Sequence, residues 1–177
     1  MIQAHGNAVY RSKAETVGSS ADLSDLAAQL KSAQQQLKHP LVTAKNLNLN
    51  LAVFAIDLRY AKHSDSELSG VFVNPKITAT KAPLVSGLED DLSLPRLAVS
   101  IERPKQIEVS FLNEQLEEQT TTFSDLAARW IQHGVDQLNG VSIIDRLNTH
   151  RKRSVKGHLR RLEEQKIETN YKLQYDN

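Results

Sequence analysis

Two polar residues, His133 and Gln137, lie four positions apart in a segment whose apolar residues recur with helical spacing. On a helix they project from one face one turn apart, which is the spacing that two metal ligands need. A neutral imidazole is a good ligand for zinc or iron, whereas glutamine offers only an amide oxygen. Alternatively, the two side chains hydrogen-bond to each other or to nearby backbone inside a buried helix, because buried polar groups need partners.

Acid–base chemistry would use a carboxylate, and the sequence offers a run of three, Glu89, Asp90 and Asp91. If Asp91 turns inward without a metal, desolvation is expected to raise its pKa so that it can act as a base. A solvated acidic loop is the simpler interpretation. The histidines of the predicted loops show no ligand spacing: His5, His39 and His63.

A basic segment near the C-terminus has two interpretations. It carries seven cations, namely Arg146, Arg151, Lys152, Arg153, Lys156, Arg160 and Arg161. Such runs on helices are usually solvated faces, but a cluster of this kind also suits the phosphates of RNA. No aromatic residues interrupt the run, so any such binding would be directed at the nucleic-acid backbone.

Composition excludes several classes of site. The 177 residues contain no cysteine, which rules out disulfides, thiolate metal sites and cysteine nucleophiles. The net charge of +1 gives no general argument for binding DNA or a membrane. The N-terminus lacks the apolar run of a secretory signal, and no stretch approaches the ~18 apolar residues of a spanning helix. A cytoplasmic protein, or one of an organelle matrix, is expected.

Hydrophobic periodicity predicts an α+β fold. Helices are expected over about 20–39, 124–139 and 149–168, where Ser124 opens the second helix and Gly140 stops it. Apolar residues occupy nearly every face of the second helix, as in a buried central helix. Short strands are expected at 51–57, 70–75, 97–102 and 106–111, with additions at 76–79 and 118–123. The organisation predicted is an irregular arm (1–19), one domain (20–168) and a tail (169–177).

Three segments, in this order and at these separations, resemble the motifs of peptide deformylase, the metallohydrolase that removes the formyl group from the initiator methionine of new polypeptides. WIQHGVDQLNGVSIIDRL (130–147) resembles the H-E-x-x-H helix and its continuation. LEDDLSLP (88–95) resembles E-G-C-L-S-x-P, and VFVNPKI (71–77) resembles the strand that ends in I-N-P. LVTAKNLNLNLAVFAID (41–57) lies at the place of G-L-A-A-x-Q. The resemblance implies an antiparallel or mixed sheet around a central buried helix, followed by a basic C-terminal helix.

The positions that the resemblance assigns to catalysis differ from the family pattern. At the three positions of the family's metal ligands, this sequence has Asp91 in place of the cysteine, His133 as in the family, and Gln137 in place of the second histidine. The glutamate that acts as general acid and base becomes Gly134. The glutamine that holds the oxyanion becomes Asn46, while the backbone N–H of Leu92 is retained. Such a site would hold no metal or only a weakly bound divalent ion, where the family uses iron, zinc or nickel, and no other cofactor is expected.

These differences predict a deformylase homologue whose catalysis is lost or severely weakened. It would serve as a binding module for peptides that begin with methionine or formyl-methionine, or for the ribosome through the segment from Arg146 to Arg161. The alternative is an active metal-dependent amide hydrolase with an Asp91, His133 and Gln137 site. Candidates to line a methionine-sized pocket are Val42, Leu92, Trp130 and Ile131, beside a peptide-pairing edge at 88–94.

Overall fold

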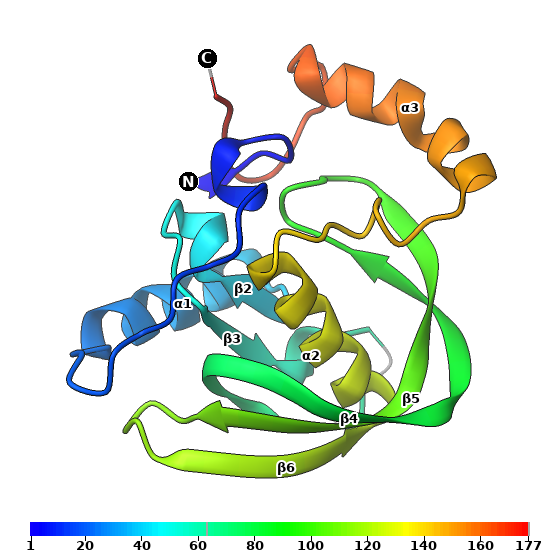
Figure 1. Ribbon diagram of the computed structural model, residues 1–177. Coiled ribbons are helices and arrows are strands. Elements are labelled where there is room, and N and C mark those ends of the chain that lie inside the picture. The colour runs from blue at the N-terminus through cyan, green and yellow to red at the C-terminus, as the bar shows by residue number, and fades with distance from the viewer. Residues whose placement is uncertain (63, 177) are drawn as a thin grey trace.

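The computed structural model describes residues 1–62 and 64–176 and contains a strongly curved antiparallel sheet (Figure 1). Its strands pair in chain order, each antiparallel to the next: β2 (Leu41–Thr43), β3 (Val53–Asp57), β4 (Ser69–Asp90), β5 (Ala98–Leu112) and β6 (Glu118–Ser124). Three register shifts along the β4–β5 pair bend these long strands around the helix in the middle of the molecule. The predicted α+β class is confirmed.

Helix α2 (Asp125–Leu138) is the predicted central helix, and it lies across the concave face of the sheet (Figure 1). Every residue from Ala128 to Leu138 is buried, whereas Ala127 is only partly buried. The helix begins after Ser124 and stops before Gly140, whose φ of 78° suits a residue without Cβ. Its apolar residues and the inner face of the sheet together form the main core.

Two other helices cover the outside. Helix α1 (Ser24–Leu37) packs on the outer face of β2 and β3, and it begins four residues later than predicted. It ends before Lys38, which adopts a left-handed conformation with φ of 49°. Helix α3 (Thr149–Glu163) packs through Val155 and Leu162 against Leu94, which follows β4, and against the start of β5. It stops five residues short of the predicted end.

The prediction of several short strands between residues 69 and 112 is wrong. The segments 70–75 and 76–79 belong to one strand, β4, and the segments 97–102 and 106–111 belong to one strand, β5. Pro83 lies within β4, where a register shift between Lys81 and Leu84 accommodates it in the ladder. Pro104 lies opposite Leu84 at the same irregular place.

The N-terminal arm, predicted to be irregular, contains one short strand and one 3-10 turn. Strand β1 (Ile2–Gln3) pairs in parallel with β7 (Leu173–Gln174), which joins the two ends of the chain (Figure 1). Beyond it, Tyr10 and Val17 are buried against the body of the protein. Strands of two residues are too short to show a periodic pattern. Within the described ranges, no helix has both the length and the apolar character that crossing a bilayer requires.

Candidate functional site

Asp91, His133 and Gln137 meet in one buried cluster, as the resemblance implies. Asp91 directly follows β4, while α2 presents the other two residues one turn apart. The Asp91 carboxylate oxygen Oδ2 lies 3.2 Å from His133 Nε2 and accepts a hydrogen bond of 3.0 Å from Gln137 Nε2. Its second oxygen accepts a 2.7 Å hydrogen bond from the Ser93 N–H. His133 and Gln137 thus find their partner in Asp91, rather than in each other.

The Gln137 oxygen and the Asn46 side chain are held by the 3-10 helix η2 (Ala44–Leu47), the residue before it and the N-terminal arm, whereas His133 Nδ1 has no hydrogen-bond partner among the described residues. The Thr43 hydroxyl donates to Gln137 Oε1, which leaves the glutamine amide hydrogen-bonded at both ends. Asn46 accepts a 2.8 Å hydrogen bond from the Thr43 N–H and donates one of 2.8 Å to the Tyr10 hydroxyl. The Asn46 side chain therefore caps η2 and binds the N-terminal arm.

A second layer of charge surrounds the cluster. Glu89 is fully buried, with Arg103 bound to both of its oxygens at 2.7 and 2.8 Å and Arg129 bound to one of them at 2.9 Å. Arg103 also pairs with Asp136 at 2.6 Å. The Oε2 atom of Glu89 lies 3.6 Å from His133 Nδ1, which completes a buried network of alternating charges. The simple interpretation of 89–91 as a solvated loop is wrong, because only Asp90 is exposed.

The electrostatics favour a charged pair between Asp91 and His133. Burial by itself would raise the pKa of Asp91, but hydrogen bonding and charge from His133, with hydrogen bonding from Ser93, hold this pKa well below its usual range. For His133, burial lowers the pKa, and the Asp91 carboxylate outweighs burial and raises it. The prediction that an inward Asp91 would have a raised pKa is therefore wrong: it has cationic and N–H donors around it.

Gly134 lies where the resemblance places the catalytic glutamate, and an aromatic ring fills the space beside it. A Cβ atom at this position would lie 2.9 Å from two ring atoms of Phe54 and 3.2 Å from a methyl group of Leu41. Phe54 is fully buried and stacks on Phe72, with ring centroids 5.0 Å apart. The site therefore has neither a proton-transfer group at this position nor room for one.

The donor set does not fit a catalytic metal ion. The carboxylate of Asp91 is bound to three N–H donors, the raised pKa of His133 favours an imidazolium that has no free lone pair, and the oxygen of Gln137 accepts from Thr43. The space among these side chains does not admit a water molecule. In residues 1–62 and 64–176, no cluster of three or more His, Cys, Asp or Glu side chains is arranged to hold a metal.

The residues predicted to line a methionine pocket belong mostly to the core. Val42 and Ile131 are fully buried in two hydrophobic clusters, and the Trp130 ring stacks on His133 with centroids 5.5 Å apart. Leu92 does border a cavity, although its carbonyl accepts a 2.8 Å hydrogen bond from the Tyr171 hydroxyl. Trp130 fills the place beside the histidine where an apolar pocket was expected.

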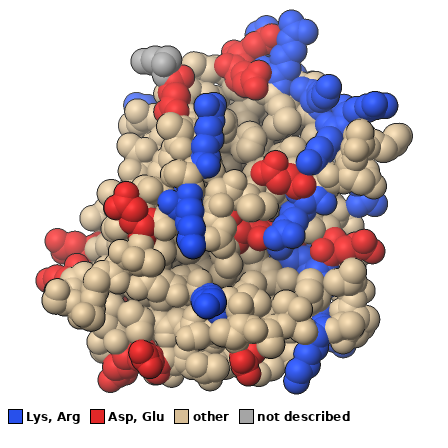
Figure 2. Space-filling model, viewed as in Figure 1, with Lys and Arg blue, Asp and Glu red and all other residues tan. Residues whose placement is uncertain are grey.

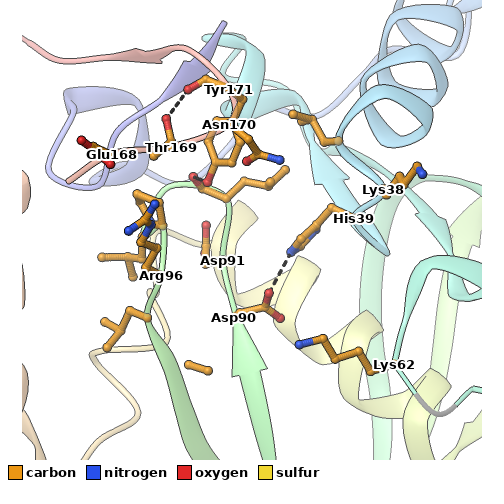
Figure 3. A pocket seen from close by; sticks show the side chains of 16 residues that line it. Lys38, His39, Lys62, Asp90, Asp91, Arg96, Glu168, Thr169, Asn170 and Tyr171 are labelled. Carbon is orange, nitrogen blue, oxygen red and sulfur yellow. Dashed lines mark hydrogen bonds and ion pairs between the residues drawn. The ribbon is translucent and has the colours of Figure 1, made fainter.

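A cavity of about 490 Å³ lies next to this cluster, between the end of α1, the end of β4 and residues 168–171 of the C-terminal segment (Figure 3). His39 and Asp90 lie side by side at this cavity, with His39 Nε2 3.8 Å from Asp90 Oδ2. Burial lowers the pKa of His39, so its ring is neutral at pH 7. Sequence reasoning missed His39, because a lone histidine in a predicted loop carries no spacing signal. His63, predicted in another loop, lies outside the described residues.

The basic residues of α3 form an exposed face (Figure 2). Some are engaged: Arg151 donates to a backbone carbonyl, and Arg160 pairs with Glu164. Arg146, which precedes α3, pairs with Asp136. Arg153, Lys156 and Arg161 are exposed, and no ion pair joins them to any described residue. They are the cations of this face that can reach a partner.

Known proteins resemble the chain in both sequence and structure. The family model described as polypeptide deformylase matches residues 1–153. Peptide deformylase from Chlorobium phaeobacteroides (strain BS1) is 28% identical over 175 residues, which cover 98% of this chain and 94% of that protein. The enzyme from Synechococcus sp. (strain CC9605) is 31% identical over 147 residues, which cover 82% of this chain and 72% of that one.

Solved structures share the fold. Arabidopsis thaliana peptide deformylase 1B with a bound inhibitor superposes with a TM-score of 0.84 at 24% identity, covering 93% of this chain and 90% of that one. The Acinetobacter baumannii enzyme bound to Met-Ala-Ser gives a TM-score of 0.77 at 24% identity, covering 83% of this chain and 97% of that one. The family match over most of the chain agrees with the motifs and with the central helix in its curved sheet, and the chain therefore belongs to the peptide deformylase family.

Proposed function

We propose that this chain is a binding module built on the deformylase fold, with deformylase catalysis lost or severely weakened, and that it binds extended peptides beside β4. The observation that carries this proposal is the closed cluster of Asp91, His133 and Gln137. Each side chain at the three metal-ligand positions is hydrogen-bonded within the protein, so metal binding would have to break that cluster.

The missing acid–base group supports the same conclusion. A positioned general acid or base typically contributes ~10²–10⁴ in rate. Gly134 has no side chain to supply it, and the contact with Phe54 leaves no room for a neighbouring group to take its place. Asp136 is two residues away, but it is engaged by Arg103 and Arg146. Proton transfer to a departing amine therefore lacks the family's group on α2, and His133 of the same helix is paired with Asp91.

Peptide binding is supported by the open edge of β4. This strand pairs with β3 only over residues 69–73, so the second edge of residues 84–90 has no strand partner in the described part of the chain. An extended peptide can add to such an edge through main-chain hydrogen bonds, which need no catalytic side chain. The cavity beside Asp90 and Leu92 gives the end of that peptide a place to lie. The Acinetobacter baumannii relative is described with Met-Ala-Ser bound.

The test measures metal content, turnover and binding on the same purified protein. We expect less than ~0.1 metal ion per chain and turnover of formyl-Met-Ala-Ser, with added iron, nickel or zinc, at least about a thousandfold below an intact deformylase. Addition of a short Met-leading peptide should shift the ¹⁵N–¹H resonances of Leu92 and its neighbours without metal. Near-stoichiometric metal with robust turnover would establish the alternative, an active amide hydrolase that uses Asp91, His133 and Gln137.

The exposed cations of α3 support a second candidate function, docking on ribosomal RNA. Such binding would be directed at phosphates and should weaken steeply with salt. Replacing Arg153, Lys156 and Arg161 by glutamine should remove it without unfolding the protein, because all three side chains are exposed. The matched control is Lys13, Lys76 and Lys172 replaced by glutamine, which changes the net charge equally away from α3. Equal loss in both variants would show that net charge, rather than this face, binds RNA.

A further inference from the structure

The His39 side chain presents an unpaired lone pair at the cavity. Its Nδ1 atom lies 2.7 Å from the Leu41 carbonyl oxygen and 3.2 Å from the Leu41 nitrogen. The ring proton is assigned to Nδ1 by the shorter contact, since two acceptors at 2.7 Å without a proton between them would repel each other. The Nε2 atom of the neutral ring is therefore an acceptor. It is buried and has no hydrogen-bond partner among the described residues. The imidazole packs edge-on with the Trp130 ring, with ring centroids 5.5 Å apart, and this contact holds the orientation of His39.

A second acceptor faces this lone pair. Asp90 Oδ2 lies 3.8 Å from His39 Nε2, and no described group donates a hydrogen bond to the Asp90 carboxylate. Figure 3 shows the two side chains facing each other at the cavity. The Asp90 side chain is 59% exposed, so it is free to adjust to a ligand. Two acceptors that face each other with no donor between them form a site for a cationic donor.

We propose that His39 and Asp90 bind the protonated amine of a peptide whose N-terminus is free. This inference rests on the proposed function, since it names the class of peptide that lies along β4. An ammonium group seated between the two atoms would donate to both of them. A formylated or acetylated N-terminus carries no charge, so the site would discriminate against the blocked peptides.

The surroundings favour a peptide over a bare metal ion. Three cationic side chains, Lys38, Lys62 and Arg96, line the same cavity together with the acidic Glu168. The cations suit the carbonyl groups and the carboxylate of a peptide, which a bare metal ion lacks. The apolar part of the cavity wall includes Leu37, Leu94 and Leu97. A volume of about 490 Å³ holds the first residues of a peptide, whose chain can continue along the open edge of β4.

The experiment compares three peptides that differ only at the N-terminus: Met-Ala-Ser, its formyl form and its acetyl form, each with the same C-terminal fluorophore, by anisotropy. We expect the free amine to bind about tenfold more tightly than the blocked forms, which is the scale of a charge-assisted hydrogen bond partly screened by solvent. Asp90→Asn should abolish that preference. Glu102→Gln removes an exposed acid from β5 outside the cavity and should retain it.

Each outcome has a separate meaning. Equal affinity for all three peptides would overturn the assignment to His39 and Asp90 and leave the proposed function standing. Absence of binding to any of them would overturn the proposed function as well. If zinc binds tightly by calorimetry and Asp90→Asn abolishes that binding, the pair is a metal site and the inference is wrong.

Discussion

Replacement of Gly134 by alanine measures how tightly Phe54 fills the position of the missing glutamate. The new Cβ atom would lie 2.9 Å from two ring atoms of Phe54, a distance that real Cβ contacts essentially never show. The ring cannot retreat easily, because it is fully buried and stacked on Phe72. Overpacking of this kind typically costs ~1–3 kcal/mol.

The helix propensity of alanine opposes this packing cost. Alanine stabilises a helix interior by ~1 kcal/mol relative to glycine. Gly157 of α3 provides the matched control, since it is exposed and a Cβ there would meet nothing within 4 Å. We expect Gly157→Ala to be stabilising and Gly134→Ala to be neutral or destabilising. The difference between the two variants isolates the packing cost, ~1–3 kcal/mol.

The measurement is urea unfolding followed by circular dichroism, with the fluorescence of Trp130 as a second probe because it is the only tryptophan. In thermal unfolding each kcal/mol corresponds to about 2–4 °C for a chain of this size. Phe54→Leu should relieve part of the clash, so the double variant should be more stable than the sum of the single effects predicts. Equal stabilisation by alanine at both glycines would refute the close packing at Gly134.

Three further variants test the charges and the ligands. Lys45 is buried, and burial lowers its pKa to about 8. The unfolded chain therefore binds more protons than the folded chain between about pH 8 and 10.5, and the free energy of unfolding should rise with pH over that window. Lys45→Met should flatten this slope, and an unchanged slope would assign it to other groups. Asp91→Cys with Gln137→His should bind zinc in a mass-spectrometric metal assay, where the unchanged protein and each single variant bind little; zinc in the unchanged protein would contradict the donor-set argument. Arg103→Met leaves Glu89 with Arg129 and Asp136 with Arg146 as their remaining arginine partners and should lose ~1–3 kcal/mol in urea unfolding, whereas a loss well below ~1 kcal/mol would mean that these partners compensate fully.

The central helix could be predicted from sequence because its signals are local. Ser124 and Gly140 mark its ends, and its apolar residues fall on nearly every face, so both its bounds and its burial follow from a short stretch of chain. The pairing of β1 with β7 could not be predicted in this way. It joins two-residue strands about 170 positions apart, and no local pattern of that length distinguishes a strand from a loop.

The site was predictable in its spacing but not in its hydrogen bonds. The spacing of four positions from His133 to Gln137 places both on one face of α2, and the motif resemblance places Asp91 opposite them. Which atoms are donors depends on Thr43, which precedes η2, and this residue type carries no signal of its own. The pKa of Asp91 was predicted to shift in the wrong direction for the same reason. Desolvation can be anticipated from burial, but the three donors that oppose it come from different segments of the chain.

The substitutions at the catalytic positions are mutually dependent, which explains why single reversions should fail. A histidine at 137 loses the amide that joins Thr43 to Asp91, and a cysteine at 91 leaves His133 without the carboxylate that raises its pKa. A glutamate at 134 collides with Phe54. Each reversion alone therefore breaks buried contacts at a cost of ~1–3 kcal/mol and gains no function. Reversion of all three, together with a smaller residue at 54, is the smallest change expected to restore both metal binding and proton transfer.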